Sequence, residues 1–243
     1  MRSSFWIDWL IFCGMITGRY FLAAGSAHWL FYRCLSKRFT LVRQPPPQQS
    51  IFKDIKLSVC SAAIFALSAA LIMLAYDSGM TRLYTSWQLY GLWYLGVSFV
   101  GVLVLQDAYF YFTHRAFHQR ALFRWLHRGH HASRTPTPWT SFAFDPPEAV
   151  IQSLFILGVV FVVPLHFATL AALLATMTIW SVINHLGFQL FSYRPLNRWL
   201  GNWLIGPAHH LLHHRRYTLH YGLYFTFWDR LLGTHYADYL KQL

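Results

Sequence analysis

Histidines are concentrated in a few short segments of this chain. Thirteen of the fourteen lie beyond residue 113. They gather in HRAFH at 114–118, in HRGHH at 127–131 and in GPAHHLLHH at 206–214. Neutral imidazole is the commonest metal ligand in proteins. These segments lie among Phe, Trp, Leu and Tyr in the chain, which favours a packed, dry metal site over a flexible metal-buffering tract.

The spacing of the histidines predicts that their rings converge. Residues three or four apart share a face of a helix. His114 and His118 are four apart, and HxxHH occurs twice, at 127–131 and at 210–214. His185, at the end of an apolar run, and His209, four residues before His213, complete the set. The ten predicted metal ligands are His114, His118, His127, His130, His131, His185, His209, His210, His213 and His214.

Ten candidate ligands are too many for one metal ion. A structural zinc takes four protein ligands and a catalytic zinc three, so two metals with four or five imidazoles each fit better. The soluble di-iron carboxylate pattern needs several glutamates and Glu-x-x-His, whereas this chain has one glutamate, Glu148. Imidazole suits iron among other metals. A pair of irons that activates dioxygen is the natural inference, although spacing alone does not distinguish iron from zinc.

Acidic and amide side chains could orient these histidines, because a ligating imidazole commonly donates its other N–H to a nearby acceptor. Asp107 lies two helical turns before His114, deep in an apolar run. We therefore expect Asp107, Asn184 and Asp229 to support the ligands. Asp145 and Glu148 are weaker candidates, because FDPPEA is also typical of a turn and helix start with Pro at the first helical position.

Long apolar segments must position the histidines. The chain is 56% hydrophobic and 12% charged, against roughly 25% charged in ordinary soluble domains. Apolar runs occupy 9–32, 57–76, 88–112 and 149–184, and about 20 residues cross the hydrocarbon core. Pro164, near the middle of the last run, predicts a helical hairpin. We expect an all-α integral membrane protein with about four transmembrane helices and a cytosolic helical cap that holds a dimetal site.

The basic residues predict the orientation. The net charge is +12, but no basic helix or RNA-type aromatic motif is present, so we expect no nucleic-acid partner. Seventeen of the twenty Lys and Arg residues fall on one side of the predicted membrane, which the positive-inside rule assigns to the cytoplasm. Within a single domain, 1–243, we expect mainly transmembrane helices at 1–112, cytosolic histidine-box regions at 113–148 and 185–243, and a membrane hairpin at 149–184.

The histidine boxes, in this order across apolar runs, resemble the fatty acid hydroxylase/sterol desaturase superfamily of membrane di-iron enzymes. The stretches 127–149 and 206–234 are similar to the sterol C5-desaturase (lathosterol oxidase) branch and its bacterial relatives. The resemblance covers about 105–236 and carries over all ten histidines; Tyr221, Gly222, Trp228 and Asp229 match the family's closing signature. In that branch Asp-Gly typically follows the position of His185, whereas here Leu186 and Gly187 follow it.

The resemblance implies an oxidoreductase with two iron ions as cofactor. It would use dioxygen to desaturate or hydroxylate a C–H bond of a sterol-like or fatty acyl lipid, with the metal ligands as the only catalytic residues. A separate electron donor of the cytochrome b5 or ferredoxin type, with its reductase, is expected. The location would be a bacterial inner membrane or the endoplasmic reticulum, with the active site facing the cytoplasm.

Several alternatives stay open from the sequence. The enzyme could be a lipid hydroxylase that acts on acyl chains rather than a sterol desaturase. A metal-binding membrane transporter and a catalytically silent partner subunit are alternatives of other classes. The aromatic residues Trp139, Phe142, Phe144 and Trp180 would suit the wall of a lipid pocket, but the interface belt of any membrane protein has the same composition.

Overall fold

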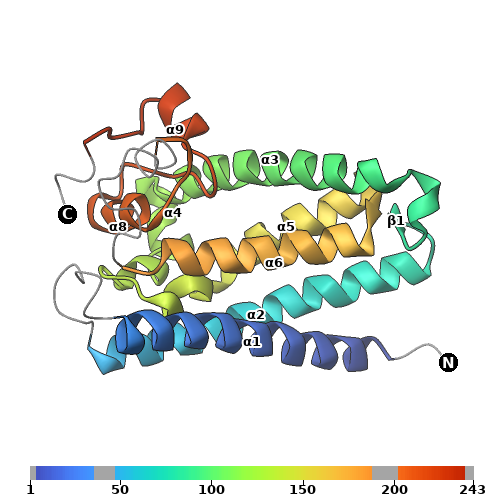
Figure 1. The fold of residues 1–243 in the computed structure, drawn as a ribbon. Coiled ribbons are helices and arrows are strands. Elements are labelled where there is room, and N and C mark those ends of the chain that lie inside the picture. Colours follow the sequence, from blue (N-terminus) through green and yellow to red (C-terminus); the bar gives the residue numbers. More distant parts are fainter. Residues whose placement is uncertain (1–3, 36–46, 188–201, 239–243) are drawn as a thin grey trace.

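Five apolar helices form the body of the molecule (Figure 1). The computed structural model describes residues 4–35, 47–187 and 202–238. The apolar helices are α1 (Phe5–His28, continued by the π-helical turn η1, Trp29–Cys34), α2 (Gln48–Asp77), α3 (Leu92–Phe117), α5 (Pro146–Val162) and α6 (Phe167–Asn184). Four of them are long and apolar enough to cross a membrane, namely Phe5–Cys34, Gln48–Asp77, Leu92–Phe117 and Phe167–Asn184. The predicted all-α membrane fold is thereby confirmed.

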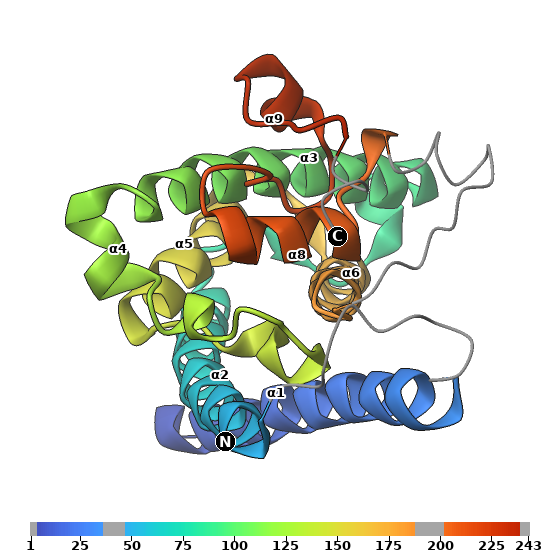
Figure 2. The ribbon, with the colours of Figure 1, turned by 90° about the vertical axis from the view of Figure 1, so that its left-hand side faces the viewer.

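Short elements complete the two ends of the bundle. At one end lie the helices α4 (Arg120–Leu126), α8 (Pro207–Arg216) and α9 (Phe227–Leu231) and the 3-10 turns η3 (His130–Ala132) and η4 (Pro138–Phe142). At the other end lie the 3-10 turn η2 (Trp87–Leu89) and the strands β1 (Leu83–Tyr84) and β2 (Leu165–His166), which pair in parallel. The first end, here called the cap, is seen face-on in Figure 2.

The last apolar run forms the expected hairpin. Helix α5 ends at Val162, Pro164 follows, and α6 begins at Phe167 and runs back toward the cap (Figure 1). Proline has no N–H to donate and cannot continue a helical hydrogen-bond ladder, so the chain reverses there. Pairing of Leu83 with Leu165 holds the turn of the hairpin against the segment that follows α2. Both the start of α5 and the end of α6 therefore lie at the cap.

Small side chains bring the helices close together. Ser58, Ala62, Ala66 and Ala70 repeat every four residues along α2 and are all buried. Small residues let helix backbones approach closely inside a membrane. A cluster of Val102, Ile156, Val160 and Leu173 fills the bundle near the hairpin turn, while Tyr20, Ala24 and Phe142 pack together beneath the cap.

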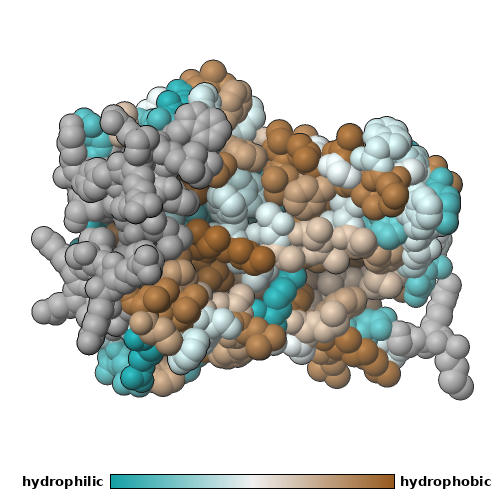
Figure 3. Space-filling view, in the orientation of Figure 1, coloured by the Kyte–Doolittle hydropathy of each residue, from teal (hydrophilic) through white to brown (hydrophobic). Residues whose placement is uncertain are grey.

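The surface of the bundle suits lipid contact. In Figure 3 hydrophobic residues cover most of the middle of the visible face, interrupted by one hydrophilic area between α1 and α6. Exposed side chains such as Trp6, Leu22, Val100 and Val162 are apolar. Eleven of the seventeen basic residues that predicted the orientation lie in the described part of the chain, at the cap end; the other six lie outside it.

Candidate metal centre

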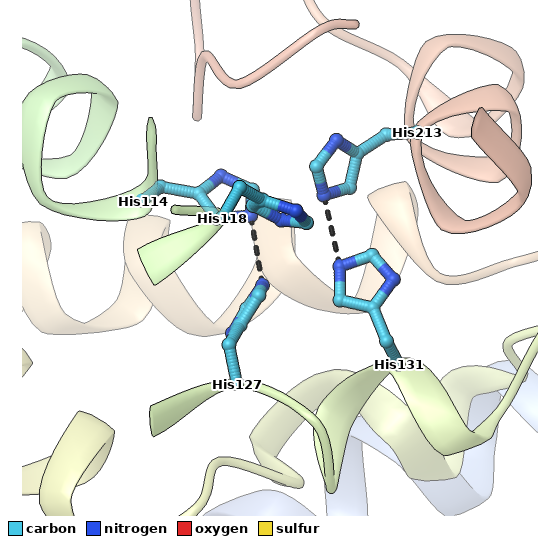
Figure 4. Close-up of side chains that lie close together, drawn as sticks. All are labelled: His114, His118, His127, His131 and His213. Carbon is cyan, nitrogen blue, oxygen red and sulfur yellow. Dashed lines mark hydrogen bonds between the residues drawn. The ribbon is translucent and has the colours of Figure 1, made fainter. Parts of the chain in front are cut away.

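Nine of the ten predicted ligands converge in two adjacent groups inside the cap. The ligand nitrogens of each group lie within 4.8 Å of one another. All nine side chains are buried except that of His118, which is half-buried. The first group comprises His114, His118, His127, His131 and His213 (Figure 4), and the second comprises His130, His185, His210 and His214.

The first group draws on three segments of the chain. His114 lies in the last turn of α3, and His118 is the residue that ends this helix. His127 is the C-cap residue that follows α4, and His131 lies in η3. HRGHH is therefore a helix end followed by a 3-10 turn and not the continuous helix that its spacing predicted. The turn nevertheless brings the two rings together, because the His131 N–H bonds the His127 carbonyl at 3.2 Å.

The two HxxHH motifs divide their histidines between the groups in a complementary way. His127 and His131 belong to the first group, whereas His130 between them belongs to the second. On α8 the assignment is reversed, because His210 and His214 share the second group and His213 faces the first. Each motif therefore supplies a pair of ligands to one group and a single ligand to the other.

In the second group, hydrogen bonds fix the tautomers of His130 and His185. The His130 Nδ1–H donates to the Ala143 carbonyl at 3.2 Å, and the His185 Nδ1–H donates to the Ser181 carbonyl at 2.7 Å. Their Nε2 atoms face each other at 3.4 Å. Burial lowers the pKa of His130 to about 4 and that of His185 to about 3. At neutral pH both Nε2 atoms therefore carry lone pairs and cannot hydrogen-bond each other.

The first group shows the same arrangement. His114 Nδ1 bonds the Tyr221 carbonyl at 2.9 Å, and His213 Nδ1 bonds the Leu219 carbonyl at 2.7 Å. His127 Nδ1 lies 2.8 Å from the buried Glu148 carboxylate. The Nε2 atoms of these three rings therefore point into the group. The Nε2 atoms of His114 and His127 lie 3.0 Å apart.

A metal ion fits both groups. Two ligand nitrogens about 2.1 Å from one metal and at right angles lie about 3 Å apart. The Nε2 pairs His114–His127, His131–His213 and His185–His210 are each 3.0 Å apart, and His210–His214 are 3.1 Å apart. Facing lone pairs at this spacing repel unless a cation lies between them. The buried Nε2 of His118 also has no hydrogen-bond partner among the described residues.

His209 lies apart from the other nine predicted ligands. It belongs to a third group with His220 and His235, whose ligand atoms also lie within 4.8 Å of one another. The Gly206 N–H donates to His209 Nδ1 at 3.3 Å. The lone pair of this ring is therefore used at Nδ1, and its Nε2 carries the proton. His209 thus helps to cap the start of α8 rather than joining the nine converging rings.

The polar residues expected behind the ligands have other partners. Asp107 accepts the backbone N–H groups of Tyr224 and Phe225, at 2.7 and 3.2 Å, and no histidine. Asn184 donates to the Leu223 carbonyl at 3.1 Å. All three contacts hold the 221–225 segment, whose unpaired backbone groups need partners when buried.

Asp229 supports a ligand through one intermediate residue. Its carboxylate accepts the N–H groups of Tyr221 and Gly222, at 2.8 and 2.9 Å, and the Thr234 hydroxyl at 2.7 Å. The Tyr221 carbonyl in turn accepts the N–H of His114. Asp229 therefore fixes the backbone that orients His114.

Glu148 is the one carboxylate in the described structure that contacts a converging histidine directly. It lies in the first turn of α5 and is fully buried. From the sequence, Glu148 is a weaker candidate because its segment is typical of a helix start. In the structure Asp145 starts the helix, as its N-cap residue. Asp145 also accepts the Gly129 N–H at 2.6 Å, which steadies the turn between His127 and His130. The feature of the sequence that could have indicated this role is a single glutamate that follows HRGHH at the start of an apolar helix.

A large apolar cavity leads from the metal groups into the membrane part of the bundle. Its volume is about 1070 Å³. The histidines that line it are His114, His127, His130, His185 and His210. Side chains of α1, α2, α5 and α6 form most of the remaining wall, down to Phe12, Met73 and Phe167. Of the four aromatic residues expected in a pocket wall, Phe142 and Phe144 line the cavity.

Together these features define a membrane protein with two buried histidine-rich sites suited to metal, at the cap end of an apolar cavity. Comparison with known proteins agrees. The family model for fatty acid hydroxylase matches residues 99–234, more than half of the chain. The protein belongs to the fatty acid hydroxylase family, as the histidine boxes predicted.

Sterol-modifying enzymes are among its relatives. The Delta(7)-sterol 5(6)-desaturase ERG3B of Gibberella zeae is 30% identical over 190 residues, which are 78% of this chain and 57% of that protein. The lathosterol oxidase of Homo sapiens is 30% identical over 217 residues, which are 88% of this chain and 69% of that protein. The chain thus spans between about half and two thirds of the length of these relatives. No solved structure matches it.

Proposed function

We propose that this protein is a membrane-bound, non-haem di-iron oxidoreductase that uses dioxygen to desaturate or hydroxylate a C–H bond of a lipid. The observation that carries the proposal is the continuity between the histidine groups and the apolar cavity. His130, His185 and His210 line the same cavity as Ile72, Phe155 and Leu174, which lie within the apolar helices α2, α5 and α6. A lipid in the cavity would therefore place an alkyl carbon beside the metal sites.

The nine converging histidines would hold the metals, and two bound irons would supply the activation of dioxygen that oxidation of an unactivated C–H bond requires. The protein's own part is to orient the ligands and exclude water. The Nδ1–H contacts of His114, His127 and His185 fix the rings, and the Phe144 ring stacks on that of His130 at an interplanar angle of 12°, where both residues line the cavity.

The electron supply and the location belong to the same proposal. Oxidation with dioxygen needs external electrons, and the proposal assigns their delivery at the cap to a separate donor of the cytochrome b5 or ferredoxin type. The basic residues at the cap support a cytoplasmic orientation, in a bacterial inner membrane or the endoplasmic reticulum. The names of the sterol-modifying relatives point to a sterol-like lipid and the name of the family to a fatty acyl lipid, so the proposal covers both classes.

The position of the histidines weighs against a metal transporter. A transporter would place ligands along a path through the membrane, whereas both groups lie at one end of the bundle (Figure 1). The complete ligand groups also weigh against a catalytically silent subunit, because a protein without chemistry has no need to retain nine buried, converging imidazoles.

The test combines metal analysis with oxidation of lipids. Purified protein in lipid nanodiscs should contain two irons per chain and, with a reductant, should change a lipid extract only when dioxygen is present. His210→Ala should remove this activity. His166→Ala, at the opposite end of the bundle where His166 bonds the Thr85 carbonyl, should retain it. Absence of bound metal, or metal transport without oxidation, would refute the proposal.

A further inference from the structure

Arg19 is a charged residue in the middle of a membrane helix. It lies 14 residues from the start of α1 at Phe5 and 15 from the end of η1 at Cys34. At about 1.5 Å per residue, each end is roughly 21 Å away along the helix axis. The hydrocarbon core extends only about 15 Å to either side of its centre. An arginine there rarely faces lipid and usually marks a binding site or an ion pair.

The side chain of Arg19 faces the cavity. Its Nε is fully buried, although the residue as a whole is half-buried. The residues of α1 that line the cavity recur every three or four positions, which is one face of a helix. They are Phe12, Met15, Ile16, Arg19, Leu22, Ala23 and Ser26, with Gly14 and Gly18 at the margin. Arg19 thus occupies the centre of an otherwise uncharged stripe.

No protein group in the described structure compensates this charge. Arg19 forms no ion pair with another described residue, and its buried Nε has no hydrogen-bond partner among them. The carboxylates of Asp54, Asp107 and Asp229 bond to hydroxyl and backbone groups elsewhere. A cation without a partner at this depth of a membrane helix is costly, so Arg19 points to a partner that enters the cavity from outside.

The rest of the cavity wall would not hold an anion by itself. Apart from the histidines, its ionisable members are Arg19, Glu148 and Tyr109. Glu148 is negative or neutral and already contacts His127. Tyr109 donates its hydroxyl to the Ile151 carbonyl at 2.6 Å. Arg19 is therefore the single fixed cation of the wall away from the metal groups.

Arg19 is also linked to the elements that carry the metal ligands. Its neighbour Tyr20 donates its hydroxyl to the Trp139 carbonyl at 2.8 Å, and the Tyr20 ring packs on Phe142 at 5.5 Å. The next residue, Ala143, provides the carbonyl that fixes His130. A group held by Arg19 would accordingly lie in a fixed position relative to the second metal group.

We propose that Arg19 binds the oxyanion of the lipid substrate, a carboxylate or a phosphate, and so selects an acidic lipid. The guanidinium would form a paired hydrogen bond with two oxygens of that group, and the alkyl part would fill the apolar remainder of the cavity beside the metal sites. This inference rests on the proposed function, because it names the class of lipid on which the oxidation would act. Of the two classes in that proposal it selects the acyl lipid, because a free sterol has no carboxylate or phosphate.

Binding can be measured without turnover. Protein in neutral nanodiscs, loaded with metal and kept anaerobic, is titrated with palmitate, hexadecyl phosphate and hexadecanol, which share one alkyl chain, and binding is followed by native mass spectrometry. The unmodified protein should bind one of the two anions at least about tenfold more tightly than the alcohol, the ratio that a charge-assisted hydrogen bond provides. The preferred anion shows whether the site takes a lipid carboxylate or a lipid phosphate.

Variants of Arg19 test whether this residue causes the preference for anions. Arg19→Met should abolish the preference while leaving the metal content unchanged, and Arg19→Lys should retain part of it. Arg120→Met, at an exposed position on α4 outside the cavity, is the matched control and should behave as the unmodified protein. Equal binding of anions and alcohol by the unmodified protein, or an unchanged preference in Arg19→Met, would overturn the proposal.

The two proposals fail in different ways. If the protein oxidises a lipid but Arg19→Met oxidises acidic and neutral lipids in the same ratio as before, the assignment of Arg19 is wrong and the proposed oxidoreductase stands. If the anion preference depends on Arg19 but no lipid is oxidised under any condition, the oxidoreductase proposal is wrong and the anion site remains.

Discussion

His130 and His185 direct the lone pairs of their Nε2 atoms at each other across 3.4 Å, although 55 residues separate them in the chain. Each ring has given its N–H to a backbone carbonyl, of Ala143 and Ser181 respectively. The backbone therefore fixes the tautomer that a metal requires before any metal binds. This preorganisation is the usual way in which an outer hydrogen bond raises the affinity of a histidine site.

Adjacent histidines should have separate effects on the two metals. His130→Ala leaves three imidazoles in its group, whereas His131→Ala leaves four in the other. Because four protein ligands suffice for a closed site, we expect His130→Ala to reduce the metal content from two ions to about one. His131→Ala should retain more metal, with an altered Mössbauer spectrum for one iron only. The measurement is metal analysis of purified protein; equal losses in the two variants would contradict the assignment.

Removing the carboxylate behind His127 should weaken metal binding. Glu148 Oε2 accepts the N–H of His127 at 2.8 Å, and both side chains are buried. Loss of such an outer contact typically costs about 10–100-fold in metal affinity. We expect Glu148→Ala to show this loss in a chelator competition assay, and Glu148→Gln a smaller one. Gln152→Ala is the control, because Gln152 lies one turn along α5 and also lines the cavity but bonds Thr113 instead. An equal effect of both alanine variants would contradict the role.

Much of this architecture could be predicted from composition and spacing. The apolar runs located every long helix, and Pro164 located the hairpin turn, because both follow from local physical rules. The helices nevertheless extend beyond the runs. Helix α3 continues to Phe117, five residues beyond the apolar run, and this polar extension is what delivers His114 to the cap.

The division of the ligands between two groups could not be predicted in the same way. Helical spacing places His127, His130 and His131 on one face. Because α4 ends at Leu126 and a 3-10 turn follows at 130–132, His130 instead points toward the second group. Asp107 was expected near His114 for the same local reason. Its actual partner Tyr224 is 117 residues away, a contact that depends on how the whole cap folds over α3.

Acid should destabilise the metal-free protein. Burial lowers the pKa of His130 to about 4 and of His185 to about 3, below the unfolded value of about 6.5. As the pH falls below about 6.5, the unfolded chain takes up protons that the folded chain refuses. Each such histidine lowers the free energy of unfolding by up to about 1.4 kcal/mol per pH unit until its folded pKa is reached.

The measurement is thermal unfolding of metal-free protein in detergent between pH 7.5 and 4.5. We expect a Tm that is nearly constant above pH 7 and falls progressively below pH 6.5. Bound metal should be released over the same acidic range, because protons compete for the imidazole nitrogens. A Tm that does not change between pH 7.5 and pH 5 would show that these imidazoles are protonated as easily in the folded protein as in the unfolded chain.

Asp229 should matter more for folding than for the affinity of the metals. Its carboxylate accepts two backbone N–H groups and the hydroxyl of Thr234, all buried. In Asp229→Asn the amide NH₂ would face one of those N–H groups, donor against donor. Leaving such a buried group unpaired costs roughly 1–3 kcal/mol in the free energy of unfolding. We expect a clear fall in Tm and, because Tyr221 still contacts His114, a smaller change in metal affinity at a temperature where the variant is folded.

The control for this variant is Asp77→Asn, which makes the same chemical change at the exposed end of α2, far from the cap. Substitutions at exposed positions usually change the free energy of unfolding by less than about 0.5 kcal/mol. Urea unfolding of both variants in the metal-free state separates stability from metal binding. If Asp229→Asn unfolds like Asp77→Asn but loses metal, the carboxylate acts on the metal site directly, and its role as a support for the 221–222 backbone is wrong.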